Sequence, residues 1–127
     1  MNLKSNIFIL FILFTILSCD KKRVFDDYKS VGNSWNKDSI VSFEIDDLEP
    51  KKPFNAFVNI RNNDGYEFSN IFLLVSLEYP DGFTKVDTLE YAMANPDGTL
   101  LGTGFTDVKE NKLFYKENLI FDKKGNY

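Results

Sequence analysis

Hydrophobic residues follow two different patterns along this chain. Residues 7–17 form an apolar run that contains a single polar residue, Thr15, whereas from residue 39 onward apolar and polar residues largely alternate. Alternation with a period of two is typical of a β-strand with one buried face, and no long stretch has the 3.6-residue period of an amphipathic helix. The sequence therefore predicts a short apolar N-terminal segment followed by an all-β domain.

The alternation predicts five strands in this domain. They lie at residues 39–46, 54–61, 71–79, 88–93 and 113–121. The first half of residues 71–79 is apolar at both sets of alternating positions, which is typical of a central strand covered on both faces. Besides these strands, we expect only a single helical turn, near residues 107–112.

Turn sequences separate the predicted strands. Pro-Asp-Gly occurs at residues 80–82 and 96–98, and Asn-Asn-Asp-Gly occurs at residues 62–65. Proline presets φ, aspartate bonds to its own backbone and glycine tolerates a positive φ, so these segments are expected to join antiparallel strands. Strands and turns at this spacing predict a single antiparallel β-sandwich domain that is jelly-roll-like in its connections.

The N-terminal apolar run is too short to span a bilayer. As a helix with a rise of ~1.5 Å per residue, its 11 residues would cross about half of the ~30 Å hydrocarbon layer. Lys4 precedes the run and the small residue Ser18 follows it, an arrangement typical of a bacterial export signal. The sequence therefore predicts a signal peptide at residues 1–18 and a mature domain at residues 19–127.

The only cysteine of the chain, Cys19, lies directly after the predicted cleavage point. An exported chain with one thiol can form no intramolecular disulfide, so this thiol needs another explanation. Residues 16–19, Ile-Leu-Ser-Cys, resemble a lipobox, in which the cysteine sulfur receives a diacylglycerol before the signal is removed. Two or three acyl chains would then hold the domain stably on a membrane. The alternative is an ordinary signal peptide with Cys19 as a buried thiol.

The composition argues against several classes of function. The chain has 15 Lys and Arg, 19 Asp and Glu, and no His. Because Lys4 leaves with the signal, the mature net charge is near −5, so nucleic acid is not an expected partner. The absence of histidine removes the commonest general base and metal ligand, which argues against Ser-His, Cys-His and zinc chemistry. No metal or cofactor is expected.

Aromatic residues make up 16% of the chain and could fill a core or form a binding surface. Phe43 and Phe54 lie at inward-facing positions of their predicted strands, where burial of each side chain would contribute about 1.5 to 3 kcal/mol. Phe57 and Phe72 lie at the opposite positions, and Trp35 lies in a predicted loop. Trp35, Phe57 and Phe72 are therefore candidate contacts for a protein partner or a glycan, and core packing is the alternative for each.

Pairs of acidic residues raise the question of catalysis. They occur at residues 26–27 and 46–47, and Asp107 lies close to Glu110 in the sequence. A glycosidase needs two carboxylates at a fixed separation, but acids at solvated strand ends explain these pairs more simply. Residues 62–65 lack the spaced acids and the terminal Glu of an EF-hand, so we interpret them as a turn. No catalytic residue is predicted.

An ordered set of short segments resembles the gliding-motility lipoprotein family GldH of the Bacteroidota. The segments are residues 23–30, 35–43, 61–62, 68–73, 87–91 and 109–118. The resemblance covers essentially the whole mature chain, and it implies a cell-envelope lipoprotein that works with other gliding lipoproteins and with the type IX secretion machinery. It implies no reaction and no cofactor, and it assigns a role to Cys19 alone, as the acylation site. It also implies that family members continue into a further strand, so we expect this chain to be truncated at its C-terminal end.

The sequence thus predicts a non-enzymatic, envelope-anchored β-sandwich that acts as a scaffold or docking component of the gliding apparatus. Its expected partners are the membrane, through the N-terminal lipid, and other envelope proteins of gliding and type IX secretion. The alternative is a lipoprotein that binds surface polysaccharide through exposed aromatic residues, Trp35 first among them. Asp20, directly after the cysteine, does not decide between the outer membrane and another periplasmic face.

Overall fold

The structure, a computed structural model, describes residues 22–46 and 48–127, and these contain four β-strands and no helix. The strands are β1 (Pro53–Asn62), β2 (Asn70–Glu78), β3 (Thr84–Ala92) and β4 (Lys109–Ile120). The signal peptide predicted at residues 1–18 and its neighbour Cys19 lie outside the described residues. Within the described part of the chain, there is no helix that is long and apolar enough to cross a membrane.

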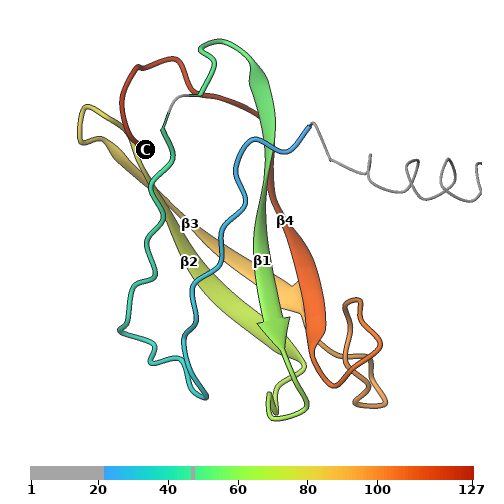
Figure 1. The fold of residues 1–127 in the computed structure, drawn as a ribbon. Helices are drawn as coiled ribbons and strands as arrows, with labels where there is room; N and C mark the ends of the chain where they lie inside the picture. Colours follow the sequence, from blue (N-terminus) through green and yellow to red (C-terminus); the bar gives the residue numbers. More distant parts are fainter. Residues whose placement is uncertain (1–21, 47) are drawn as a thin grey trace, which may run out of the picture.

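The four strands form two antiparallel sheets of two strands each. β1 pairs with β4, and β2 pairs with β3. Residues 22–46 run lengthwise beside the sheets as extended chain and a loop (Figure 1). Residue 22 and the C terminus lie at one end of the molecule, and the loops at residues 31–38, 63–69 and 93–108 lie at the other (Figure 1). The prediction of an all-β, antiparallel domain is therefore confirmed.

Four of the five predicted strands are confirmed, and the fifth is not a strand in the structure. Residues 39–46 keep the predicted alternation only in part, since Val41 and Ile45 are half-buried. The inward position expected for Phe43 is wrong, because its side chain is 38% exposed and packs against Phe25 of the N-terminal segment. Of these residues, Ile45 alone pairs with another extended segment through its backbone. It exchanges two hydrogen bonds with Tyr127, at 3.0 and 2.9 Å. The helical turn expected near residues 107–112 is wrong, because β4 begins at Lys109 and pairs with β1 from that residue onward.

Both Pro-Asp-Gly segments form tight turns, as predicted. In the β2–β3 turn, the Gly82 N–H donates to the Tyr79 carbonyl, and the Phe83 N–H donates to the Asp81 carboxylate. Gly82 has φ of 86°, a value that a residue with a side chain adopts only with strain. The segment at residues 96–98 closes a second hairpin in the same manner, with a backbone bond from Gly98 to Asn95. Residues 62–65 also form a turn, in which the Gly65 N–H donates to the Asn63 side chain.

β2 is covered on one face only, which contradicts the expectation of cover on both. Its inward residue Leu73 is buried, together with Met93 and Phe121 elsewhere in the core. Phe72 and Leu74, on the other face, are 65% and 76% exposed. The apolar pattern of β2 correctly predicts a strand, but within the described residues its outer face is left open to solvent.

Aromatic rings join the two sheets at the end where the C terminus lies. The Tyr127 ring packs against Tyr79 at the end of β2 and against Phe121 just after β4, with centroid distances of 5.4 and 4.7 Å. Phe121 in turn packs against Phe54 of β1, at 6.0 Å. Edge-to-face pairs of this kind contribute about 0.5 to 1.5 kcal/mol each beyond the burial of their area. This cluster therefore connects a residue of each sheet through Tyr127.

We predict that Tyr127→Ala lowers the free energy of unfolding by about 1 to 3 kcal/mol, because two ring contacts are lost while the backbone bonds to Ile45 remain. The measurement is urea unfolding of the purified chain, followed by the fluorescence of Trp35. Phe105→Ala is the matched control, since Phe105 is fully exposed in a loop and its removal should leave stability unchanged. Equal stabilities for the two variants would contradict the role of the ring cluster.

Candidate functional site

The three residues predicted to contact a partner or a glycan do not form one surface. Trp35 lies in the loop before residue 39 and is 44% exposed, and its indole N–H donates to the Ser39 carbonyl at 2.9 Å. Phe57 lies on the outer face of the β1–β4 sheet and is 41% exposed. Phe72 lies on the outer face of the other sheet. All three side chains are exposed, but they are carried by three separate elements, and their role as contacts stays a prediction.

The outer face of the β1–β4 sheet is occupied by contacts within the chain. The Phe57 ring packs edge-to-face against Phe114, its cross-strand partner, at 6.0 Å, and the Lys112 ammonium lies 4.3 Å from the Phe57 centroid. Further along, the Arg61 guanidinium stacks over the ring of Tyr28 at 4.0 Å. These aromatic residues are partly exposed, but each already has an aromatic or cationic neighbour.

Segment 22–30 is fastened to the same sheet by its tyrosine. The Tyr28 hydroxyl donates to the Glu110 carboxylate at 2.6 Å, and Glu110 lies 3.6 Å from Arg61 on the neighbouring strand. Burial and this bond to Glu110 raise the pKa of Tyr28, so the hydroxyl stays protonated as a donor. Glu110 is therefore engaged in holding the N-terminal segment and does not form an acid pair with Asp107.

Of the two outer sheet faces, the face of the β2–β3 sheet is the less covered. Its cross-strand pairs include Phe72 with Glu90, Leu74 with Thr88 and Ser76 with Val86. Phe72, Leu74 and Val86 are 65%, 76% and 57% exposed, and adjacent side chains on one sheet face lie within contact distance. Phe72 and Leu74 lie two residues apart on β2, and Val86 lies diagonally across from Leu74 on β3; these three exposed side chains are called the apolar strip below.

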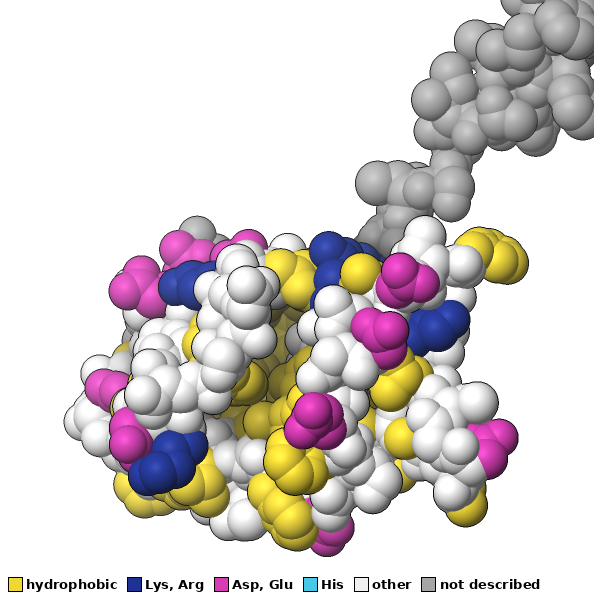
Figure 2. Space-filling view, turned by 90° about the horizontal axis from the view of Figure 1, so that it is seen from below, with side chains coloured by type: hydrophobic (Ala, Val, Ile, Leu, Met, Phe, Trp, Pro, Cys, Tyr) yellow, Lys and Arg dark blue, Asp and Glu magenta, His cyan; other side chains and the backbone are white. Residues whose placement is uncertain are grey.

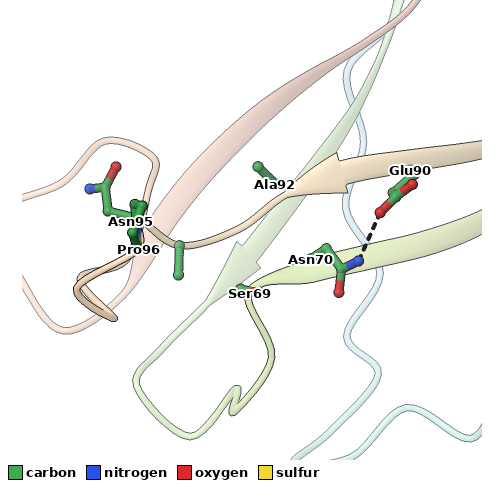
Figure 3. A pocket seen from close by; sticks show the side chains of 7 residues that line it. Ser69, Asn70, Glu90, Ala92, Asn95 and Pro96 are labelled. Carbon is green, nitrogen blue, oxygen red and sulfur yellow. Dashed lines mark hydrogen bonds between the residues drawn. The ribbon is translucent and has the colours of Figure 1, made fainter.

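A shallow depression of about 450 Å³ continues this face toward the loops (Figure 3). Asn70 of β2 and Glu90 of β3 point toward each other across it, with a hydrogen bond of 2.8 Å from the Asn70 amide to the Glu90 carboxylate (Figure 3). The remaining lining comes from the ends of the strands and the hairpin that follows β3: Ser69, Ala92, Ala94, Asn95 and Pro96. No basic side chain lines it, so it offers nothing to neutralise an anionic ligand.

Between the sheets, a polar cluster connects β3 with β4. The Tyr115 hydroxyl donates to the Asp87 carboxylate at 2.8 Å, and the Lys116 ammonium lies 2.7 Å from the same carboxylate. Consecutive residues of a regular strand point to opposite faces, but the β1–β4 register shifts at this place, and Tyr115 has no cross-strand partner. The β-bulge directs both side chains toward Asp87.

The pKa shifts of this cluster favour the charged forms of Asp87 and Lys116. Lys116 and Tyr115, which both donate to the carboxylate, lower the pKa of Asp87. The bond to Asp87 raises the pKa of Lys116, and burial, followed by the bond to Asp87, raises the pKa of Tyr115. The cluster therefore holds one negative and one positive charge at neutral pH and acts as a contact between sheets.

The described residues offer little that suggests catalysis. Asp26 is paired with Arg23, and Asp46 borders a second depression, of about 350 Å³, that also contains Glu49 and Lys52. Within residues 22–46 and 48–127, no group of three or more Cys, Asp or Glu side chains is arranged to hold a metal ion.

The end of the molecule opposite the C terminus is hollowed, and apolar side chains line the hollow (Figure 2).

Residues 23–127 match the family described as GldH lipoprotein. The chain belongs to the GldH lipoprotein family. It is 58% identical, over all of its 127 residues, to the gliding motility lipoprotein GldH of Flavobacterium johnsoniae, of which it covers 79%. It is 48% identical, over 98% of its length, to the GldH homolog of Christiangramia forsetii, of which it covers 78%. No solved structure matches the chain. The family resemblance seen in the sequence is thereby confirmed.

For this GldH family member, two features of the site were missed by sequence reasoning. Leu74 was expected to be covered, and Val86 lies before the strand predicted at residues 88–93, although both are exposed on the same sheet face as Phe72. The Asp87 cluster was also missed, although the sequence contains a sign of it. Asp87 lies on the same inward-facing side of β3 as Leu89 and Tyr91. A charged residue at such a position requires a partner from the opposite sheet.

We predict that Asp87→Asn lowers the free energy of unfolding at neutral pH and that the difference from wild type disappears in acid. Because the pKa of Asp87 is lower in the folded chain than its usual 3.8, its contribution is complete above that value and is lost as the pH falls through the folded pKa. Urea unfolding at a series of pH values between about 2 and 7 measures the difference. Asp64→Asn, in an exposed turn, is the control. A difference that persists unchanged at pH 2 would contradict the charged pair.

Proposed function

We propose that this chain is a lipid-anchored, non-catalytic docking or scaffold component of the bacterial gliding machinery, associated with type IX secretion. The observation that carries the proposal is the match of residues 23–127 to the GldH lipoproteins, whose relatives in two organisms are named for gliding motility. The absence of histidine from the sequence and the lipobox-like residues 16–19 agree with a lipoprotein that has no catalytic centre.

In this proposal, residues 1–18 are a signal peptide, Cys19 is the acylated residue, and residues 19–127 are one domain that the longer family members extend. The two sheets would be the halves of a β-sandwich whose interior contains Leu73, Met93 and Phe121. The domain would sit in the cell envelope, on the outer membrane or on another periplasmic face, and the N-terminal lipid would attach it to the bilayer.

The mechanism is positional. A protein held in the plane of a membrane meets other anchored proteins at a much higher effective concentration than it would in solution. A contact that is weak in solution can therefore be occupied most of the time on the membrane. For such docking the domain needs only an exposed surface and a lipid tether. The polar and aromatic contacts between the sheets hold the strands that form this surface in place.

The second candidate function is the binding of surface polysaccharide. One observation favours it: exposed Phe72 lies opposite Glu90, beside the depression in which Asn70 and Glu90 meet. A sugar could stack on the ring and bond to the amide and the carboxylate. The separation of Trp35, Phe57 and Phe72 on three elements weighs against a shared aromatic platform.

We predict that Cys19→Ala moves the protein from the membrane fraction to the soluble fraction and abolishes gliding. The physical reason is that the predicted anchor depends on the acyl chains, at about 0.8 kcal/mol for each buried methylene. Fractionation of inner and outer membranes, together with the intact mass of the mature protein, measures both the anchor and its membrane.

Trp35→Ala is the control for this experiment, because it leaves Cys19 intact and should stay in the membrane fraction. A wild-type protein recovered from the periplasm with an unmodified thiol would contradict the anchored function. A Cys19→Ala variant that remains in the membrane fraction would do so as well.

A further inference from the structure

We propose that the outer face of the β2–β3 sheet is the docking surface for a protein partner that presents an apolar strip flanked by Lys or Arg. The inference rests on the docking function proposed above and adds to it a surface and the chemistry of its partner. It follows from the geometry of the face, from the sequence pattern of β2 and from the charges around the strip.

The geometry makes the face a single continuous surface. Nine-residue β2 pairs with β3 over its whole length, without a register shift. The outward positions are Asn70, Phe72, Leu74, Ser76 and Glu78 on β2 and Thr84, Val86, Thr88, Glu90 and Ala92 on β3. Three of these are large and apolar, and all three are more than half exposed.

The sequence of β2 is that of a strand covered on both sides. Residues 71–75 are all apolar, a run typical of strands buried on two faces, whereas a strand with one solvated face usually alternates. The described chain covers the inner face, where Leu73 is buried, and leaves the outer face open. A partner over Phe72 and Leu74 would complete the burial that the pattern indicates.

The aromatic residues of the other sheet differ from Phe72 in having neighbours within the chain. On the β1–β4 sheet, Phe57 contacts both Phe114 and Lys112, so part of its surface is already used. Within the described residues, no ring or cation contact of this kind involves Phe72. The strip therefore presents an unoccupied aromatic ring beside two aliphatic side chains.

The charges select the partner. Glu78 and Glu90 are the only ionisable side chains among the ten outward positions, and both are acidic. Two copies of this chain docked through the same face would bring four carboxylates together without a base, and an anionic lipid surface would also be repelled. A protein with Lys or Arg beside an apolar strip complements both the charge and the hydrophobicity of this face.

The size of the whole outer face, of which the strip is a part, indicates that this contact depends on the anchor. At ~3.4 Å per residue, nine residues span about 30 Å, and two strands present a width near 10 Å, or about 300 Å². A stable interface buries about 800 Å² on each partner, so the strip would be the centre of a weak contact. Attachment of both proteins to one membrane would compensate for that weakness.

The experiment introduces a photo-crosslinking phenylalanine analogue in place of Leu74 in the full-length protein, produced in its native host, with Phe57 as the matched control position. We expect one discrete, protease-sensitive adduct from position 74 and none from position 57. The crosslinked partner peptide, read by mass spectrometry, should contain Lys or Arg beside apolar residues. Combining the analogue with Glu78→Lys and Glu90→Lys should reduce the adduct at least five-fold.

The charge-reversed protein is checked for folding by its thermal unfolding, and Glu78→Lys alone, which leaves the Asn70–Glu90 bond intact, serves as a second variant. An adduct with a second copy of this chain, with lipid or with polysaccharide would overturn the proposal, as would the absence of any adduct from position 74. If no adduct forms at position 74 and Cys19→Ala still abolishes gliding, the anchored function stands and the surface assignment alone is wrong. A polysaccharide adduct would instead favour the second candidate function.

Discussion

The architecture depends on the contacts that side chains make between two sheets with no strand pairing in common. β1 pairs with β4 and β2 pairs with β3, and no strand of one sheet pairs with a strand of the other. Within the described residues, the backbone connection between them is limited to the segment after β3, through the isolated bridges Ala94 to Leu100 and Thr103 to Glu110. A two-stranded sheet is at best marginally stable in water, and each sheet therefore requires the other. The Tyr127 ring cluster at one end and the Asp87 cluster along the strands provide that connection. The apolar core between them is small, with Leu73, Met93 and Phe121 buried.

A small core has a direct consequence for the outer surfaces. A two-stranded sheet has two faces. When the inner face packs against the opposite sheet, the outer face must be exposed to solvent, covered by the rest of the chain or covered by a partner. The β1–β4 sheet uses the second solution in part, because Tyr28 of the N-terminal segment lies against Arg61 and Glu110. The β2–β3 sheet has no such cover among the described residues, although its sequence is the more apolar of the two. The asymmetry between the sheets is therefore the main structural reason to look for a partner on one of them.

Sequence reasoning predicted what is local in this structure. The Pro-Asp-Gly turns and the strand alternation were correct because φ preferences and the period of two act over a few residues. The pattern at residues 39–46 was real, but a strand also needs a pairing partner, and only Ile45 has one. The inward direction of both Tyr115 and Lys116 depends on a bulge in the register of β4 with β1, which no local pattern encodes. Whether β2 is covered is likewise decided by how the whole chain packs, so its apolar character could be predicted from the sequence and its exposure could not.

The length of the proposed tether limits where this domain can act. Tyr28 is held to Glu110 by a bond of 2.6 Å, so the domain is anchored to its own N-terminal segment from that residue onward. Tyr28 lies nine positions after Cys19, and at no more than about 3.5 Å per residue this stretch reaches about 30 Å. If the lipid is on Cys19, the domain stays within roughly its own diameter of the headgroups. Its docking surface can then meet only partners that lie equally close to the same membrane, which is the condition under which a small apolar strip is sufficient for recognition.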